Sequence, residues 1–522
     1  MSTLSKRILS AWNTQAVCVN TLSIDLQKNL LAVKKLLPSE DILTYQFQTE
    51  DNVACAIVYA DGIVNKQLIG DLIARPISRL ALLENLPQNK ENEGGMVELK
   101  LKLIEETVLF PEMKTMSSLE DIGKEVLDGN PLLLIDGVTK GLIVGAKFLP
   151  IRTIMEPPTD IAVKGPREGF IEDIKTNMAL IRKRLKTPDL RFETIRLGKR
   201  SETMVSVCWL EGTSNPQVKN ALMKKLQEIQ IDCIPDSSYI AAFLAPRKHS
   251  IFHSLGKTEK PDIFAAKLCE GRVGILVDGS PIALTAPFLL TEDLQSSEDY
   301  FISPFMATIF RFLRFFALFV AILLPAFYVS AQLFKIQLLP LGLTLTIASS
   351  VRELPLSPSL EMFVVLFLLE VLKEASIRMP KYVGMSLSVV GALVLGETAV
   401  SAGFLSTPAI IIVAFSGICL YTVPNFVETG SILRWLFLII AGSIGPFGIV
   451  LLFTFVLYYL LSADSFGAPL LAPFSPLIPH DLRDTVVKYD LFSLKTRPKT
   501  LDSNNKTRLS LVKRQPKGEE KS

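Results

Sequence analysis

Residues 312–334 have the sequence FLRFFALFVAILLPAFYVSAQLF, an apolar run of 23 residues broken only by Arg314 and Pro325. An α-helix needs about 20 apolar residues to cross the hydrocarbon core of a bilayer. Arg311 and Arg314 flank or enter the start of the run, and basic residues beside a membrane helix mark its cytoplasmic end. The run therefore predicts a membrane span that begins in the cytoplasm.

The charge distribution divides the chain around this run. Residues 301–465 carry 15 charged side chains among 165 residues, whereas the whole chain of 522 residues has 55 Lys or Arg and 52 Asp or Glu. The net charge of +3 is too small to argue for a nucleic-acid partner. The sequence thus predicts a large soluble N-terminal region, a polytopic α-helical membrane domain and a short soluble tail.

Further apolar runs indicate further membrane spans. Residues 383–403 and 408–424 are candidate spans, and residues 433–461 are too long for one straight span. Glycines and a proline within 442–448 can kink or fold this last run. We place the membrane domain at residues 306–465, with four spans or alternatively six.

Both chain ends are expected on the cytoplasmic side. The apolar residues after Lys6 and Arg7 are broken by polar residues at 13–15, so they make no secretory signal. Six widely spaced cysteines are typical of reduced thiols. The tail at 481–522 has eleven Lys or Arg against six Asp or Glu. With both ends inside, the number of spans is even.

The soluble region contains an internal repeat. VACAIVYADGIVN at 53–65 matches TMVSVCWLEGTSN at 203–215, and GNPLLLIDG at 129–137 matches GRVGILVDG at 271–279. Each copy pairs β-rich runs that end in an acid–Gly turn, with helical periodicity after the first run. The acid–Gly pairs are interpreted as tight turns that need a positive φ rather than as ligand sites. The repeat predicts two tandem α/β modules.

These observations divide the chain into six parts. They are an N-terminal extension at 1–40, module 1 at 41–150, a connecting segment at 151–187, module 2 at 188–305, the membrane domain at 306–465 and a basic cytoplasmic tail at 466–522.

The connecting segment contains a breaker-rich stretch and a basic amphipathic helix. Gly165, Pro166 and Gly169 break the chain, and apolar residues then recur at helical spacing up to Leu185. The basic end of the helix suits its C-terminus, although acidic lipid headgroups are an alternative partner. We expect the stretch Gly165–Phe170 to join modules or protomers. Its candidate contact residues are Gly165, Pro166, Arg167, Glu168, Gly169 and Phe170.

The sequence contains none of the motifs that would identify a familiar class of enzyme. The sequence has no P-loop, no HExxH, no nucleophile–base motif and no metal-ligand spacing. We therefore expect no catalytic function, no cofactor and no bound metal.

A series of motifs resembles the A subunit of GerA-type spore germination receptors from endospore-forming bacteria. The resemblance covers about residues 50–490. In order, the motifs are EP at 156–157, GPREGF at 165–170, TNMALIRKRL at 176–185, EGRVGILVDGSP at 270–281, SEDY at 297–300, LLPAFYV at 323–329, RELP at 352–355, VGALVLGETAVSAG at 390–403 and LAPFSPL at 471–477.

The resemblance implies a multi-pass protein of the spore inner membrane. It implies two partners, a transporter-like B subunit that is the better candidate for nutrient binding and a lipoprotein C subunit. It also implies that this subunit forms homo-oligomers and acts as a ligand-gated ion channel. A paralogue associated with dipicolinate transport has a similar sequence, so that alternative stays open.

Ionisable residues inside the membrane domain are candidates for an ion path, because such residues usually face a bundle interior or water. The acidic candidates are Glu361, Glu370, Glu374 and Glu397. Glu370 and Glu374 share a helix face, and rings of carboxylates from identical subunits select cations. Alternatively, Lys373 pairs with Glu370 inside a half-buried helix. The two functional hypotheses are therefore a nutrient-gated cation channel and a non-conducting scaffold for the transporter-like subunit.

Overall fold

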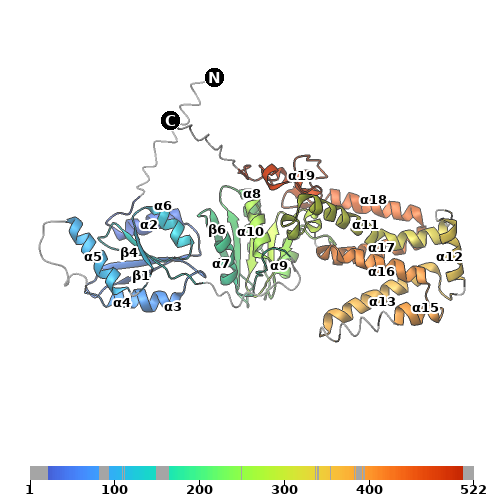
Figure 1. The fold of residues 1–522 in the computed structure, drawn as a ribbon, viewed down its shortest axis with the longest axis horizontal. Coiled ribbons are helices and arrows are strands. Elements are labelled where there is room, and N and C mark those ends of the chain that lie inside the picture. The colour runs from blue at the N-terminus through green and yellow to red at the C-terminus, as the bar shows by residue number, and fades with distance from the viewer. Residues whose placement is uncertain are drawn as a thin grey trace, which may run out of the picture.

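Two α/β modules and a bundle of helices follow one another along the long axis of the molecule (Figure 1). The structure is a computed structural model. It describes residues 21–509 except 82–92, 109, 111, 149–163, 248–249, 336, 338–339, 353, 381–382, 384–390 and 392–393.

Module 1 is built on a five-stranded antiparallel sheet. The strand order is β1-β2-β4-β5-β3. The strands are β1 (Ile42–Gln48), β2 (Ala54–Ala60), β3 (Met113–Met116), β4 (Leu132–Ile135) and β5 (Gly141–Val144).

Helices cover both faces of this sheet. Successive side chains of a strand point to opposite faces, so Cys55 and Ile57 pack on one helical layer while Ala56 and Val58 pack on the other. The first layer contains α3 (Lys66–Leu68), η1 (Ile69–Ala74), α4 (Arg75–Ser78) and α5 (Glu93–Thr107), and the second contains α2 (Leu26–Leu36) and α6 (Leu119–Leu127).

Module 2 repeats this arrangement. Its sheet has the equivalent order β6-β7-β9-β10-β8 and is also antiparallel. Its elements are α7 (Ile174–Arg184), β6 (Leu190–Leu197), β7 (Thr203–Leu210), α8 (Pro216–Gln227), α9 (Ser237–Leu244), β8 (Gly256–Thr258), α10 (Pro261–Cys269), β9 (Val273–Val277) and β10 (Ala283–Ala286).

The acid–Gly turns that define the repeat lie on equivalent elements. Asp136 follows β4, and its carboxylate accepts a hydrogen bond from the backbone N–H of Leu26 in α2. Asp278 follows β9 and accepts one from Ile174 in α7 in the same way. The α/β fold of both modules is confirmed, and each module begins with a helix held by such a turn.

The modules therefore start earlier than the sequence predicted. Leu26 and Val33 of α2 are buried against the sheet of module 1, and Ile174 and Leu180 of α7 are buried against that of module 2. These helices are parts of the modules, not of an extension at 1–40 or a connecting segment at 151–187. The two helices are not part of the repeat seen in the sequence, which comprises only the strands and the helix after the first strand run.

The C-terminal half of the chain is a bundle of apolar helices. They are α11 (Pro304–Phe334), α12 (Leu341–Val351), α13 (Pro358–Arg378), α16 (Thr407–Tyr421), α17 (Val427–Ile444) and α18 (Pro446–Leu461), with the short η6 (Val394–Thr398) and α15 (Ala399–Ser401) before α16. Residues 384–390 and 392–393 of the predicted span at 383–403 lie outside the described residues.

α11 and α17 run away from module 2, whereas α13, α16 and α18 run towards it. α16 returns alongside α11, because Ala409 packs with Val329 and Leu420 packs with Ala317. The predicted run 433–461 divides at Gly445 into α17 and α18. Both free ends of this hairpin lie at module 2, where Thr429 donates to the Ile251 carbonyl and the Ser462 carbonyl accepts from Arg247.

Two described helices are long and apolar enough to cross a membrane by length and composition, Pro304–Phe334 and Pro424–Ile444. Thr407–Tyr421 and Pro446–Leu461 are apolar but shorter. The number of spans, four or six, stays a prediction. After α18 the chain returns to module 2, where the Ser465 hydroxyl donates to the Ser254 carbonyl.

Candidate functional site

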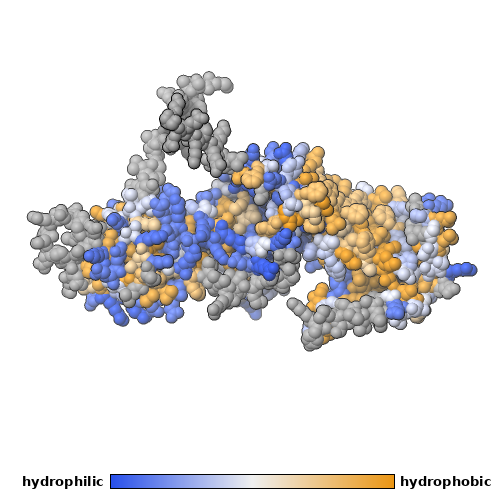
Figure 2. Space-filling model, viewed as in Figure 1, coloured by the Kyte–Doolittle hydropathy of each residue, from blue (hydrophilic) through white to orange (hydrophobic). Residues whose placement is uncertain are grey.

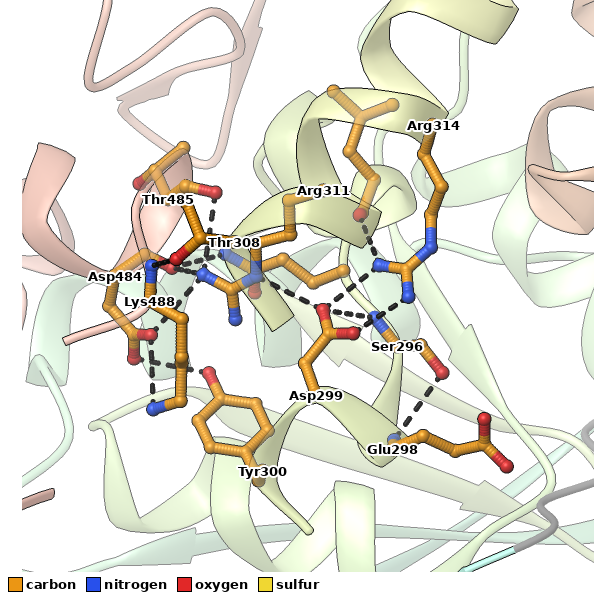
Figure 3. A network of polar contacts seen from close by, with 12 residues as sticks. Ser296, Glu298, Asp299, Tyr300, Thr308, Arg311, Arg314, Asp484, Thr485 and Lys488 are labelled. Carbon is orange, nitrogen blue, oxygen red and sulfur yellow. Dashed lines mark hydrogen bonds and ion pairs between the residues drawn. The ribbon is translucent and has the colours of Figure 1, made fainter. Parts of the chain in front are cut away.

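A cluster of buried charges joins module 2, the first helix of the bundle and the tail (Figure 3). We call it the junction cluster. Its members are Asp299 and Tyr300 from η4 (Ser297–Tyr300), Arg311 and Arg314 from α11, and Asp484 and Lys488 from the tail.

Asp299 is the centre of the cluster. Its carboxylate accepts two hydrogen bonds from Arg314, at 2.7 and 2.9 Å, and one from Arg311 at 3.0 Å. The Ser296 N–H also donates to it, as in a helix capping box. Asp299 has no exposed surface, and the Arg311 side chain is 2% exposed. The first turns of α11 are thus fixed to module 2 by a fully enclosed carboxylate.

Asp484 holds the tail to the same helix. Its carboxylate accepts a hydrogen bond from the Tyr300 hydroxyl at 3.1 Å and lies 3.4 Å from both Arg311 and Lys488. The Lys488 ammonium sits 4.1 Å from the centre of the Tyr300 ring, a favourable cation–π position. A movement of α11 must therefore move both module 2 and the tail.

The electrostatics favour the charged form of Asp299 and disfavour that of Lys488. Burial alone would raise the pKa of the Asp299 carboxyl, but Arg314 and Arg311 hold it below its ordinary value. Burial lowers the pKa of the Lys488 ammonium, and the nearby charge of Arg311 lowers it further. The carboxylate of Asp484 opposes both effects but does not outweigh them. Three cations thus share two carboxylates, an arrangement that stays intact only while the three segments remain together.

Glu370, a predicted ion-path residue, belongs to a second polar network within the helical bundle. It pairs with Lys373 at 2.6 Å and with Arg434 of α17 at 2.8 Å. Arg434 is 1% exposed and also donates to the Ser416 hydroxyl, which donates to the Ala321 carbonyl. The network therefore links α13, α17, α16 and α11, and the predicted pair of Glu370 with Lys373 is present.

The other three candidate carboxylates lie in different surroundings. Glu361 is fully buried and accepts a hydrogen bond from the Ser406 N–H at the start of α16. Glu374 pairs with Arg378 at 2.6 Å, and its side chain is 57% exposed. Glu397 lies in η6 and is exposed. The four carboxylates thus do not converge on one site within the monomer.

The stretch Gly165–Phe170 packs against module 2. A Cβ atom on Gly165, whose φ is +113°, would lie 2.6 Å from the Phe301 ring. Glu168 pairs with Lys183 at 2.7 Å and with Arg184 at 2.8 Å, and Phe170 packs edge-on against Phe264. These contacts lie within one module. The roles of Pro166, Arg167 and Gly169 between protomers stay predictions.

The contact between the two modules uses residues that the sequence reading did not select. Arg182 of α7 makes two hydrogen bonds to Asp41, at 2.8 and 2.9 Å, and both side chains are almost completely buried. The Phe192 N–H of β6 donates to the Ser39 hydroxyl. In the sequence, Arg182 stands out only as part of the basic end of a helix.

The described residues contain no group of three or more His, Cys, Asp or Glu side chains that could hold a metal ion.

The sequence contains local signs of some members of the junction cluster, but it does not show that these residues contact one another. Arg311 and Arg314 stood at i and i+3 in an apolar run, and Ser296 and Asp299 fit the spacing of a capping box. Asp484 gave no local signal of the cluster, because Tyr300 and Arg311 lie more than 170 residues away and only Lys488 is near it in the sequence.

Sequence similarity to known proteins extends over most of the chain. The family model described as "Bacillus/Clostridium GerA spore germination protein" matches residues 30–500. Spore germination protein KA of Bacillus subtilis is 30% identical, over 93% of this chain and 88% of its own. Spore germination protein GerLA of Bacillus cereus is also 30% identical, over 87% of this chain and 90% of its own. The uncharacterized membrane protein YfkQ of Bacillus subtilis is 34% identical over 93% of both chains.

Among solved structures, the N-terminal domain of the A subunit of the Bacillus megaterium spore germinant receptor GerK3 is 28% identical to this chain. The match covers 52% of this chain and 97% of the other, with a TM-score of 0.39. The resemblance seen in the sequence motifs is confirmed by the family match over most of the chain. This chain belongs to the GerA family of spore germination proteins.

Proposed function

We propose that the chain is the A subunit of a nutrient-responsive germination receptor and forms a ligand-gated cation channel as a homo-oligomer. In this proposal the helical bundle lies in the spore inner membrane, with both chain ends in the cytoplasm. Its partners are a transporter-like B subunit that binds the nutrient and a lipoprotein C subunit.

One observation supports the channel most directly, namely that the bundle has two unlike sides. α11 and α18 expose large apolar side chains, among them Phe316, Phe327, Phe447 and Phe455. The elements α12, α13 and η6 also expose polar and charged side chains. These are Thr346, Ser349, Arg352, Glu374 and Glu397. α18 and α13 lie on opposite sides of the bundle in Figure 1.

This asymmetry has a physical consequence if the bundle lies in a bilayer. An ionisable side chain that faces lipid is costly, so such residues face a bundle interior or a water-filled cavity. Homo-oligomers commonly close around a rotation axis. An assembly with α12, α13 and η6 towards the axis would place Glu374 and Glu397 in rings that attract cations, while α11 and α18 would face lipid.

The junction cluster provides a route from the soluble modules to this pore. Asp299 ties module 2 to α11, and α11 contacts α16 through the Ser416–Ala321 hydrogen bond. Arg434 connects Ser416 to Glu370 on α13. A displacement of module 2 or α11 on nutrient binding would thus reach the side of the bundle that carries the acidic side chains.

The test is cation flux from liposomes that contain the purified chain together with its B and C subunits. A panel of amino acids and sugars serves as the stimulus, and potassium release is recorded with an ion-sensitive dye. We expect release with the complete assembly and none with the B and C subunits alone. Release of equal size without this chain would contradict the channel assignment.

A second function is favoured by a different observation. Glu370 and Glu374 each have a cationic partner within the monomer, and Glu361 caps α16. Carboxylates that already have partners within the monomer are less available to attract a passing cation. They are compatible with a non-conducting scaffold that stabilises the transporter-like subunit. The scaffold predicts that nutrient binding by the B subunit depends on this chain, while the liposomes release no potassium under any condition.

A further inference from the structure

An apolar cavity of about 270 Å³ lies between α11, α17 and α18, beneath the turn η3 (Leu290–Leu294) of module 2. Neither the channel nor the scaffold role makes use of it. Its inner wall consists of buried side chains, Leu433 and Phe437 of α17 and Ile322 of α11.

The cavity opens sideways between two helices of the apolar side. Phe315 and Phe319 of α11 and Phe453 and Leu457 of α18 line it, and all four are more than one third exposed. Figure 2 shows that hydrophobic side chains predominate over the helical bundle, in contrast to the hydrophilic modules. A molecule within the bilayer therefore reaches the cavity without passing through water.

The dimensions suit a segment of a hydrocarbon chain. Lining residues of α11 extend from Phe315 to Leu323, which is about 12 Å at a rise of about 1.5 Å per residue. A water molecule occupies about 30 Å³ in the liquid, and a methylene group is of similar size. The cavity therefore has room for about nine such groups.

The cavity has one polar end. Asp293 and Thr291 of η3 line it there. The Oδ2 atom of Asp293 is shielded from water and has no hydrogen-bond partner among the described residues. Burial and the neighbouring Glu292 raise the pKa of the Asp293 carboxyl to about 7. The Asn425 side chain hydrogen-bonds to this carboxyl and opposes the rise in pKa. An unpartnered buried acceptor is unfavourable, so Oδ2 can still take one further donor.

The polar end lies where the bundle meets module 2. Arg314 donates to the carbonyl of Leu294, the residue after Asp293, at 2.9 Å. Beyond Arg314 the lining of α11 is apolar, from Phe315 onwards. In a membrane-embedded bundle this is the level of the lipid headgroups.

We propose that the cavity binds an acyl chain of a membrane phospholipid with a primary ammonium headgroup, such as phosphatidylethanolamine. The chain lies between α11 and α18, and the ammonium donates to Asp293. This proposal rests on the membrane location in the proposed function, but not on conductance. A bound lipid would wedge module 2 and the α17–α18 hairpin in one arrangement, so that lipid occupancy regulates the coupling between them.

The headgroup chemistry distinguishes this lipid from others. A charge-assisted hydrogen bond to a carboxylate needs an N–H donor. The trimethylammonium of phosphatidylcholine has none, and the headgroups of phosphatidylglycerol and cardiolipin carry no ammonium to pair with Asp293. Phosphatidylcholine with identical acyl chains therefore provides a matched control that changes only the donor.

The test uses the full chain in nanodiscs that contain phosphatidylethanolamine with a diazirine group in one acyl chain. After irradiation, labelled peptides are identified by mass spectrometry. We expect labelling within 315–323 and 453–460, with a several-fold lower yield when the diazirine lipid is phosphatidylcholine. Asp293→Asn is expected to abolish this difference between the two lipids.

A filling variant separates the cavity from the general lipid-facing surface. Leu318→Trp places a larger ring inside the cavity and is expected to lower the labelling at least fivefold. Leu313→Trp is the matched control, because Leu313 lies on the same helix, is 56% exposed and does not line the cavity. It is expected to leave the labelling unchanged.

Three results would overturn the proposal. One is equal labelling of wild type and Leu318→Trp, and another is equal labelling by the two lipids in the wild type. The third is displacement of the lipid by an equimolar single-chain alkylamine, which would assign the site to a free amphiphile. Absence of labelling anywhere on α11 and α18 would contradict the membrane location as well, whereas loss of potassium release with normal labelling would contradict only the channel.

Discussion

At the residue scale, we expect Asp299 to contribute more to the stability of the fold than any of the carboxylates selected from the sequence. It has no exposed surface and is bonded to two arginines. Removing one partner of a buried ion pair costs about 3–5 kcal/mol, because the other charge stays buried without compensation. The two arginines enclosed with Asp299 depend on its charge in this way.

We therefore predict that Asp299→Asn lowers the stability of the full chain by about 3 kcal/mol. The measurement is thermal unfolding of the detergent-solubilised protein, with protease cleavage between module 2 and α11 as a second readout. Glu298→Gln is the control in the same turn, since its carboxylate lies in an exposed contact with the Lys164 N–H. Equal stability of Asp299→Asn and wild type would show that the cluster does not hold α11.

A second prediction at this scale concerns pH. The pKa of Asp293 is about 7 in the folded chain and about 3.9 in an unfolded one. A carboxyl whose pKa is raised by folding makes the folded state progressively less stable as the pH rises from about 4 to about 7. Above pH 7 the loss is constant.

Asp293→Asn removes this loss. In lipid-free detergent the variant is expected to match wild type near pH 4 and to be more stable by over 1 kcal/mol at pH 8, since one pKa unit corresponds to about 1.4 kcal/mol. The groups that act on Asp293 are Glu292, Lys267, Lys257 and Asn425. Unfolding temperatures at several pH values test the prediction, and parallel pH profiles of variant and wild type would contradict it.

At the scale of elements, the α17–α18 hairpin depends on one glycine. Gly445 has φ +76° and ψ −150°, a region essentially restricted to glycine. A Cβ atom there would lie 2.8 Å from two carbons of the Phe334 ring. Backbone strain and steric overlap therefore act together at the turn that lets α18 fold back along the bundle.

Gly445→Ala is accordingly predicted to destabilise the bundle by about 3 kcal/mol or more. The amount of monodisperse protein in size-exclusion chromatography after extraction is the readout. Gly342→Ala is the matched control, because its Cβ would meet no atom within 4 Å and alanine favours a helix. Similar yields of the two variants would show that the turn tolerates a side chain.

The elements also show what the sequence could predict. The acid–Gly turns identified the repeat, because a positive φ leaves a local signature, and both sheets follow from it. The apolar runs at 312–334 and 408–424 correspond closely to α11 and α16. Long-range pairs were not predictable, since Asp41 and Arg182 or Arg311 and Asp484 carry no local sign of their partners. The cavity was not predictable either, because the residues that line it come from segments far apart in the sequence.

At the scale of the whole molecule, the tail and the modules lie at the same end of the bundle. The backbone N–H of Asn504 donates to the Thr213 carbonyl of module 2, and Asp484 contacts Arg311. If the bundle spans a membrane, as in the proposed function, this arrangement determines which segments share a side. Residues 1–305 and 481–522 are then on one side of the membrane, with α12 on the other.

Impermeant thiol labelling of sealed vesicles tests this topology. Cys233 of module 2 is an exposed free thiol, and Lys506→Cys and Thr346→Cys add exposed sites in the tail and in α12. Each thiol is studied in a chain whose other cysteines are replaced. We expect Cys233 and Lys506→Cys to react from the same side and Thr346→Cys from the opposite one. Labelling of Cys233 and Lys506→Cys from opposite sides would exclude an even number of spans.

The last prediction separates the four acidic residues by what surrounds them. Glu370 compensates the charge of the buried Arg434, so Glu370→Gln leaves that cation with neutral hydrogen-bond partners only. We expect low protein levels for this variant, because the cost of an uncompensated buried charge is several kcal/mol. Glu361→Gln keeps an oxygen for the Ser406 N–H and is expected to be milder.

Glu374 and Glu397 are exposed on the monomer, so neither neutralisation should affect folding. If these side chains line a pore, Glu397→Gln and Glu374→Gln reduce potassium release from nutrient-treated spores at normal protein levels, and a double variant reduces it further. A carboxylate ring acts through charge, so Glu397→Asp should retain release where Glu397→Gln does not. Unchanged release in the double variant, with protein levels equal to wild type, would remove the carboxylate ring and leave the scaffold role as the better account of this bundle.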